Sequence, residues 1–153
     1  MVKILFICHG NICRSAMAEF VMKDIVKKNG KEADYEIASA ATSREEIGNP
    51  VYPPVQKILN ENGIDCSGKY ARQMTKADYK YYDMIICMDH YNVRNLSYIC
   101  DDPDGKVSLL LDRDVADPWY TRNFKETWDD INEGCQMLYE ETSKPTFGNL
   151  RPI

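Results

Sequence analysis

Short apolar runs alternate with helical stripes along the chain, and this alternation predicts its elements. The first run, residues 2–7, is apolar apart from Lys3 and partly β-branched, which is typical of a parallel strand covered on both faces. From Ser15 the apolar positions recur with the period of a helix, which Gly30 can end. The same reasoning predicts further strands at 35–40, 84–88 and 106–111, and further helices that begin near Pro53, Thr75, Asp89 and Phe124.

The order of these elements predicts an α/β fold, with a doubly wound, four-stranded parallel sheet and helices on both faces. Ligands of such sheets bind outside the carboxyl ends of the strands. We therefore expect the loops after Ile7, Ala40, Met88 and Leu111 to converge on a binding site.

The length of 153 residues fits one domain with one main core. No repeat, linker or low-complexity stretch indicates a second domain. We expect a single domain over residues 1–142 and a surface tail over residues 143–153, where Pro145, Gly148 and Pro152 interrupt any helical pattern.

Composition and charge narrow the class of protein. With 44% hydrophobic and 28% charged residues, the chain has the composition of an ordinary globular protein. Its formal net charge of -5 disfavours nucleic acid or an acidic membrane surface as a partner, because both bind a basic face. The N-terminal segment lacks the pattern of a secretory leader, and no apolar run approaches the length of a membrane helix. We expect a cytoplasmic protein.

The cysteines are scattered through a chain large enough to fold without disulfides, so we expect reduced thiols. No pair has the Cys-x-x-Cys spacing, and the only histidines are His9 and His90, which disfavours a structural zinc site. We predict no metal and no cofactor. The cysteines are Cys8, Cys13, Cys66, Cys87, Cys100 and Cys135.

The most distinctive segment joins the first strand to the first helix, and it holds Cys8 and Arg14 with five residues between them. Backbone N–H groups in a tight loop that enters a helix can point inward around a phosphate, and the helix start adds positive charge. Arg14 would complete this anion site with a planar fork that contacts two phosphate oxygens at once. The same field favours the thiolate form of Cys8. The predicted phosphate-binding residues are His9, Gly10, Asn11, Ile12, Cys13, Arg14 and Ser15.

Two polar side chains of this loop have predicted supporting roles. Ser15 can donate a hydrogen bond to the sulfur of Cys8, and Asn11 can brace the loop through its side-chain amide. The alternative is that Cys8 is a small buried residue at a strand end and Arg14 a solvated helix residue. The full combination favours a nucleophile beside an anion site. The segment does not fit the GxxxxGK[ST] nucleotide loop, because it lacks the second glycine and the lysine.

The stretch CHGNICRSAMAE, from Cys8 to Glu19, closely resembles the signature of the low-molecular-weight protein tyrosine phosphatases. The resemblance continues in the family's order to about Glu141. Further matching segments are SAAT at 39–42, GNP at 48–50, ARQ at 71–73, and Asp117 with Pro118.

The resemblance implies a metal-free, two-step phosphoryl transfer from phosphotyrosine in proteins. Cys8 would attack phosphorus and form a phosphocysteine, while Arg14 and the loop amides hold the equatorial oxygens. Asp117 would protonate the leaving phenolate and later take a proton from the attacking water. From the residues alone, Asp117 is one of several loop aspartates, and Pro118 adds only a bias toward an extended backbone.

The resemblance also assigns roles around this centre. Trp119 and Tyr120 would form an aromatic wall for the phenyl ring, although two buried core aromatics are the alternative. Cys13 would form a reversible protective disulfide with the nucleophile, with a small apolar filler as the alternative. Ser39 resembles the family residue that braces Asn11. We expect a monomer that self-associates at most weakly.

The sequence departs from the family pattern at the mouth and behind the loop. Lys69 stands where related enzymes can carry a histidine, and residues 43–46 place charge where some members have an aromatic. Bacterial relatives that act on phosphoarginine tend to have threonine where this chain has Ile12, so Ile12 favours phosphotyrosine over that alternative.

An arsenate reductase of the same fold is the main rival from another class. It would pass oxidation along two further cysteines, and Cys87 and Cys100 are too far apart in sequence to resemble that pair. A phosphocysteine carrier of sugar transport lacks an equivalent of Arg14. A papain-like hydrolase is disfavoured because His9 is adjacent to Cys8.

Overall fold

The computed structural model describes residues 1–145, which form a parallel sheet of four strands in the order β2-β1-β3-β4. The strands are β1 (Val2–Cys8), β2 (Tyr35–Ala41), β3 (Met84–Cys87) and β4 (Val107–Leu109). The order reverses between β1 and β3, so the chain winds outward in both directions from β1. The predicted doubly wound fold is confirmed.

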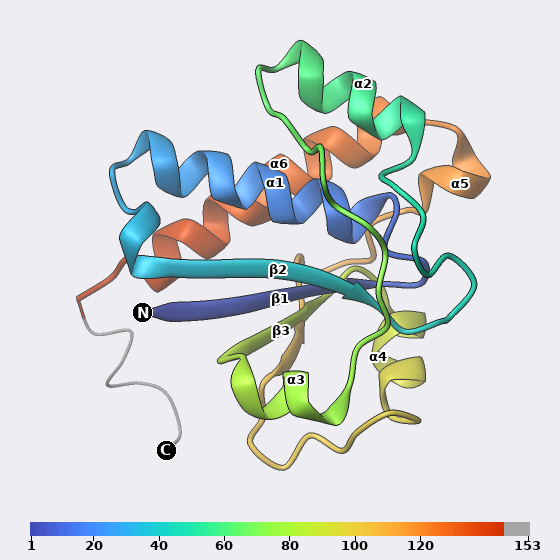
Figure 1. The fold of residues 1–153 in the computed structure, drawn as a ribbon. Helices are drawn as coiled ribbons and strands as arrows, with labels where there is room; N and C mark the ends of the chain where they lie inside the picture. The colour runs from blue at the N-terminus through green and yellow to red at the C-terminus, as the bar shows by residue number, and fades with distance from the viewer. Residues whose placement is uncertain (146–153) are drawn as a thin grey trace.

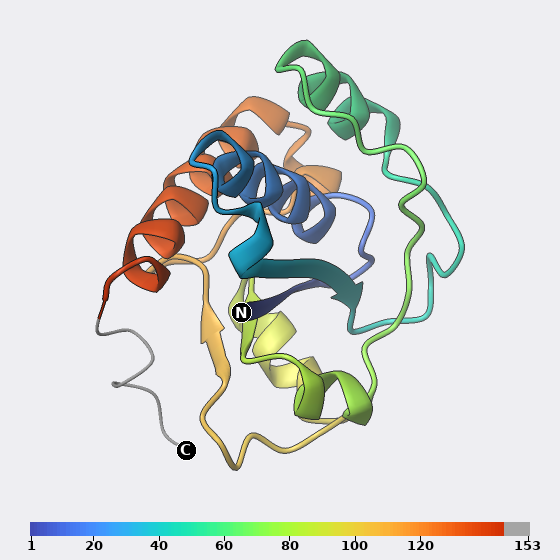
Figure 2. The same ribbon diagram turned by 60° about the vertical axis from the view of Figure 1, so that its left-hand side comes forward.

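Helices cover both faces of the sheet, as Figures 1 and 2 show. One face carries α1, α2 and α6, and the other carries α3 and α4. The helices are α1 (Arg14–Lys28), α2 (Pro53–Glu61), α3 (Lys76–Tyr81), α4 (His90–Leu96), α5 (Pro118–Thr121) and α6 (Phe124–Thr142), with a 3-10 turn at Glu32–Asp34. No helix within residues 1–145 is long and apolar enough to cross a membrane.

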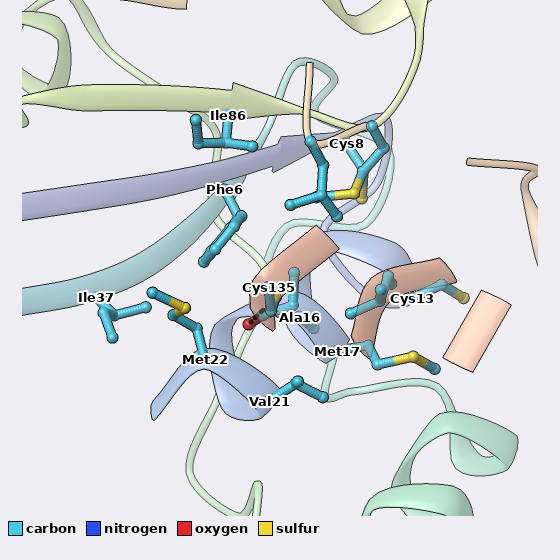
Figure 3. Close-up of a cluster of buried hydrophobic side chains, with 14 of the residues drawn as sticks. Phe6, Cys8, Cys13, Ala16, Met17, Val21, Met22, Ile37, Ile86 and Cys135 are labelled. Carbon is cyan, nitrogen blue, oxygen red and sulfur yellow. Dashed lines mark hydrogen bonds between the residues drawn. The ribbon is translucent and has the colours of Figure 1, made fainter. Parts of the chain in front are cut away.

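The central strand β1 explains the two-sided cover, because its side chains alternate between two cores. Ile4 and Phe6 pack with α1 and α6, whereas Leu5 and Ile7 pack on the opposite face, and all four are fully buried. Figure 3 shows the first of these cores, in which Phe6 lies among side chains of α1, of β2 and of α6. This packing fixes the end of β1, and with it the start of the loop that follows.

The loops at the carboxyl ends of the strands converge, as the doubly wound order requires. The N–H of Thr42, after β2, donates to the carbonyl of Cys8 at 3.0 Å. The N–H of Val115, after β4, donates to the carbonyl of Met88 at 2.9 Å. These bonds gather the segments that follow all four strands at one edge, which lies at the right of Figure 1.

Two details differ from the sequence-based expectation. The last strand spans only Val107–Leu109, because β3, the strand with which it pairs, ends at Cys87 opposite Leu109. The loop after β4 ends in the short helix α5, which is not among the helices predicted from the sequence. The sequence does carry the cue for α5, since Asp117 caps its N-terminus and Pro118 occupies the first turn. The predicted tail lies mostly outside the described residues.

Candidate active site

The loop between β1 and α1 is buried at both of its ends. Cys8 closes β1 with 3% of its surface exposed, and Arg14 opens α1 with 2% exposed. Between them Asn11 adopts the left-handed backbone region, with φ of 62°. Asparagine tolerates this region better than most residues, so the chain can curl tightly enough to bring its N–H groups inward.

The sulfur of Cys8 lies at the bottom of this curl and contacts two hydrogen-bond donors. The backbone N–H of Asn11 donates to Sγ at 3.3 Å, and the Ser15 hydroxyl lies 3.0 Å from Sγ. Donors directed at sulfur stabilise its negative charge. The geometry therefore suits a thiolate at Cys8.

Asn11 links this contact to the rest of the loop. Its Nδ2 donates to Ser15 Oγ at 2.8 Å and to Ser39 Oγ at 2.9 Å, and its Oδ1 accepts from the Arg72 N–H at 3.2 Å. These bonds use the whole side-chain amide, and Asn11 is only 1% exposed. The structure thus brings Asn11, Ser15 and Ser39 together directly beneath Cys8.

Arg14 extends across the site and is held by groups from two other loops. Its Nη1 donates to Asp89 Oδ2 and to the Val115 carbonyl, both at 2.7 Å, and its Nη2 lies 3.5 Å from Asp117 Oδ2. Burial alone would lower the pKa of Arg14, but the negative charges of Cys8, Asp89 and Asp117 outweigh this and raise that pKa. The guanidinium therefore stays a cation at every working pH.

Asp117 reaches the same place from the N-terminus of α5. Its backbone is extended, with φ of -78° and ψ of 114°, in agreement with the bias expected before Pro118. Its Oδ1 accepts from the Trp119 N–H at 3.0 Å, which leaves Oδ2 directed toward Arg14. One quarter of this side chain is exposed, so a molecule bound above Cys8 can contact it.

A hollow of about 120 Å³ opens above the sulfur. Trp119 and Tyr120 line it and are 47% and 81% exposed, so the alternative of two buried core aromatics is wrong. The Trp119 ring packs on the Tyr52 ring with 5.1 Å between centroids, which steadies this wall. The lining residues are Cys8, His9, Gly10, Ile12, Cys13, Arg14, Glu45, Glu46, Asp117, Trp119 and Tyr120.

Residues 3–146 match the family model of the low molecular weight phosphotyrosine protein phosphatases. The chain belongs to this family. The resemblance seen in the sequence and the prediction of an enzyme of this class are both confirmed.

Relatives match this phosphatase over most of its length. The low molecular weight protein-tyrosine-phosphatase YfkJ of Bacillus subtilis is 38% identical over 152 residues, which cover 94% of this chain and 97% of YfkJ. The crystal structure of YfkJ superposes with a TM-score of 0.90 over 93% of this chain and 94% of that one. SP-PTP from Streptococcus pyogenes gives 0.86 at 39% identity, over 99% of this chain and 100% of its own. Vibrio vulnificus Wzb, solved with benzylphosphonate, gives 0.81 at 28% identity over 91% and 97%.

Sequence reasoning missed Asp89, which holds the central arginine of this phosphatase. Asp89 also caps α4, where it and Asn92 form a capping box. The capping pattern was readable in the sequence, but a capping role gave no reason to connect Asp89 with Arg14. That connection exists only because β1 and β3 are neighbours in the sheet.

A buried ion pair behind the loop of the phosphatase was also missed. Ser39 Oγ donates to Glu19 Oε1 at 2.6 Å, and Lys69 Nζ lies 3.3 Å from the same oxygen. Lys69 also donates to the Ser39 carbonyl at 2.8 Å. Burial lowers the pKa of Lys69, and Glu19 opposes this. Lys69 thus fills the position noted for histidine in related enzymes, where it braces Ser39 from behind.

Cys13 precedes α1 and lines the hollow, although only 5% of its surface is exposed. Burial raises the pKa of its thiol, and the negative charges of Cys8 and Asp117 raise it further. Cys13 is therefore a neutral thiol in the same loop as Cys8, and neither cysteine is in a disulfide in the structure.

Proposed function

We propose that this phosphatase hydrolyses phosphotyrosine in proteins through a phosphocysteine intermediate on Cys8. One observation carries the proposal: Cys8 and Arg14, from the two ends of one loop, and Asp117, from a loop far away in sequence, line the same hollow. They supply a nucleophile, a fixed cation and a carboxyl group, which together are what a metal-free phosphoryl transfer requires.

The first step transfers the phosphoryl group to sulfur. The Cys8 thiolate attacks phosphorus opposite the phenolic oxygen, so that the S–P bond forms as the P–O bond to the ring breaks. Arg14 and the N–H groups at the start of α1 bind the equatorial oxygens, where charge collects in the transition state. Asp117 gives its proton to the departing phenolate, which leaves as tyrosine.

The second step releases inorganic phosphate. Asp117, now a carboxylate, takes a proton from a water molecule that attacks phosphorus as the S–P bond breaks. Ser15, 3.0 Å from the sulfur, donates to the thiolate as it leaves. The enzyme returns to its starting state, with Asp117 protonated and Cys8 as thiolate.

The aromatic wall supports an aryl phosphate as substrate. Trp119 and Tyr120 stand beside the hollow with exposed ring faces on which a phenyl ring can pack. Ile12 also lines the hollow and offers a branched apolar surface, which favours phosphotyrosine over phosphoarginine. Vibrio vulnificus Wzb was solved in complex with benzylphosphonate, an aromatic phosphonate that resembles an aryl phosphate.

The remaining assignments follow from the same chemistry. A thiolate nucleophile must stay reduced, and the cytoplasm is the compartment that keeps thiols reduced. Two further predictions stand: that Cys8 and Cys13 can be oxidised to a protective disulfide, and that the protein is a monomer.

In the arsenate reductase alternative, further thiols would have to reach Cys8. Cys87 is fully buried, and burial raises the pKa of its thiol to about 12, which disfavours that role.

Substitution of Asp117, the proposed general acid, tests the mechanism, because the loss of rate should depend on the leaving group. Asp117→Asn should lower kcat by about 10²–10³-fold with phenyl phosphate and by less than about tenfold with p-nitrophenyl phosphate, whose phenolate needs little protonation. Both rates are measured with a chelator present, with arsenate reduction in the presence of thioredoxin followed in parallel. Asp112→Asn is the matched control, because Asp112 is 95% exposed and should leave both rates unchanged. Equal losses on both phosphates would contradict the general-acid role.

The hydrogen bonds of the Asn11 side chain give a second prediction. Asn11→Ala removes the bonds to Ser15, Ser39 and the Arg72 N–H, and it places alanine at a positive φ. We expect kcat/KM to fall by about tenfold or more and the free energy of unfolding to fall by about 3 kcal/mol. Phosphatase assays and urea unfolding check both. Asn62→Ala, which removes one bond at the exposed end of α2, should leave kcat/KM intact. Unchanged kinetics in Asn11→Ala would show that the brace does not position the loop.

A further inference from the structure

A second, larger hollow adjoins the active site. Its volume is about 460 Å³, and it shares His9, Arg14, Asp117 and Tyr120 with the hollow above Cys8. The two therefore form one continuous mouth. A substrate whose phosphorylated ring fills the smaller hollow would lay its neighbouring residues in the larger one or across the opposite rim.

Acidic side chains stand on both rims of this mouth. Glu45 and Glu46 line the smaller hollow, and Asp114 lines the larger one. Glu46 lies close to Gly10 in the loop between β1 and α1. A Cβ atom built on Gly10 would be only 3.3 Å from Glu46 Cγ. The side chains of Glu45 and Asp114 are 69% and 44% exposed, so a bound peptide can contact them.

The side chains that contact these carboxylates are histidines and an amide, not lysine or arginine. Glu45 contacts His9 at 2.9 Å, and Glu46 accepts from the Asn49 amide at 2.6 Å. Asp114 Oδ1 lies 2.5 Å from His90 Nδ1 and accepts a hydrogen bond from the backbone N–H of His90 at 3.1 Å. Across residues 1–145, no lysine or arginine forms an ion pair with Glu45, Glu46 or Asp114.

None of the arginines in this part of the molecule forms an ion pair with Glu45, Glu46 or Asp114. Arg113 is adjacent to Asp114, but its guanidinium binds Asp130 and Glu133 of α6. Arg122 binds the Tyr52 hydroxyl. Arg44 is exposed and lines neither hollow. Arg14 is buried and already faces Asp89 and Asp117.

We propose that this acidic mouth selects phosphotyrosine flanked by lysine or arginine and disfavours phosphotyrosine flanked by acidic residues. The proposal rests on the proposed function, since it concerns the peptide around the same phosphotyrosine. A phosphate dianion entering between these carboxylates is repelled, and a cationic neighbour in the peptide offsets that repulsion by facing them. An extended peptide places its nearest flanking residues within about 3–7 Å of the phosphorylated residue along the chain, so they lie beside the mouth that these carboxylates line.

Two phosphotyrosine peptides that differ only in lysine or glutamate at the flanking positions test this selection. We expect kcat/KM to be about tenfold or more higher for the lysine peptide at about 0.05 M salt, and the ratio to shrink severalfold at about 0.5 M salt. In the variant Glu45→Gln/Glu46→Gln/Asp114→Asn the ratio should fall to about two or less. Glu140→Gln, at the far end of α6, should keep the full ratio.

The kcat/KM ratio of the lysine peptide to the glutamate peptide is taken within each variant, so a partial loss of folding or of general activity cancels. Phenyl phosphate turnover in the unsubstituted enzyme reports the proposed function separately. If phenyl phosphate is hydrolysed but both peptides have equal kcat/KM, the selection is wrong and the function stands. A tenfold ratio that persists in the triple variant would equally overturn the role of these carboxylates. Absence of phenyl phosphate turnover would refute the proposed function itself.

Discussion

Cys8→Ser should lower kcat toward phosphotyrosine peptides by at least about 10⁴-fold while the protein stays folded. A serine hydroxyl keeps its proton at neutral pH, and the contacts at this position are built to stabilise an anion rather than to remove a proton. They are the Asn11 N–H at 3.3 Å and the Ser15 hydroxyl at 3.0 Å. Arg14 and the loop N–H groups remain, so the variant should still bind the phosphorylated peptide.

The experiment separates chemistry from binding. Steady-state turnover and equilibrium binding of one phosphotyrosine peptide are measured side by side, and acid quenching of the unsubstituted enzyme should trap a phosphorylated peptide that contains Cys8. Cys100→Ser is the matched control, because Cys100 is a half-buried thiol packed against the other core. It should keep turnover within about twofold. Turnover retained in Cys8→Ser, or phosphate trapped on another residue, would contradict the mechanism.

The loop between β1 and α1 could be predicted from the sequence because the residue pattern that indicates it is local. An apolar run, then Cys8, then Arg14 at the start of a helical pattern places a thiol and a cation on one turn of chain whatever the rest of the fold does. The sheet order could be predicted for a related reason. Strands alternating with helices permit few arrangements once crossovers are right-handed.

The partners of Arg14 could not be predicted in this way. The contact between Arg14 and Asp89 joins residues far apart in sequence, and the contact with the Val115 carbonyl involves a main-chain atom that is the same in every residue type. Likewise, the pair of Lys69 with Glu19 depends on the path of the segment after α2, which runs alongside the end of β2 and bridges it at Ala41 and Gln73. Asp117 was found through the family resemblance, since its local signal was only an aspartate before proline.

Arg14→Lys should lower kcat/KM by about 10³-fold although the positive charge is kept. The guanidinium donates from Nη1 to Asp89 and the Val115 carbonyl and presents Nη2 toward Asp117 and the hollow. A lysine ammonium is a single point of charge, and the lysine side chain is shorter than that of arginine. If it satisfies Asp89 it cannot also contact two phosphate oxygens, and if it turns to the phosphate it leaves a largely buried carboxylate unpaired.

Arg14 must bind both Asp89 and the phosphate oxygens, and this predicts how the loss of kcat/KM in Arg14→Lys divides between KM and kcat. Phosphate oxygens gain charge in the transition state, so most of the loss should fall on kcat, and the affinity for inorganic phosphate should weaken by only about tenfold. The free energy of unfolding should fall by about 1–2 kcal/mol, because one of the bonds to Asp89 and Val115 is lost. Arg113→Lys is the matched control, since Arg113 is half exposed and binds carboxylates of α6 that line neither hollow. A loss confined to KM would show that Arg14 binds the ground state alone, and its bidentate fork would then have no special part in the transfer.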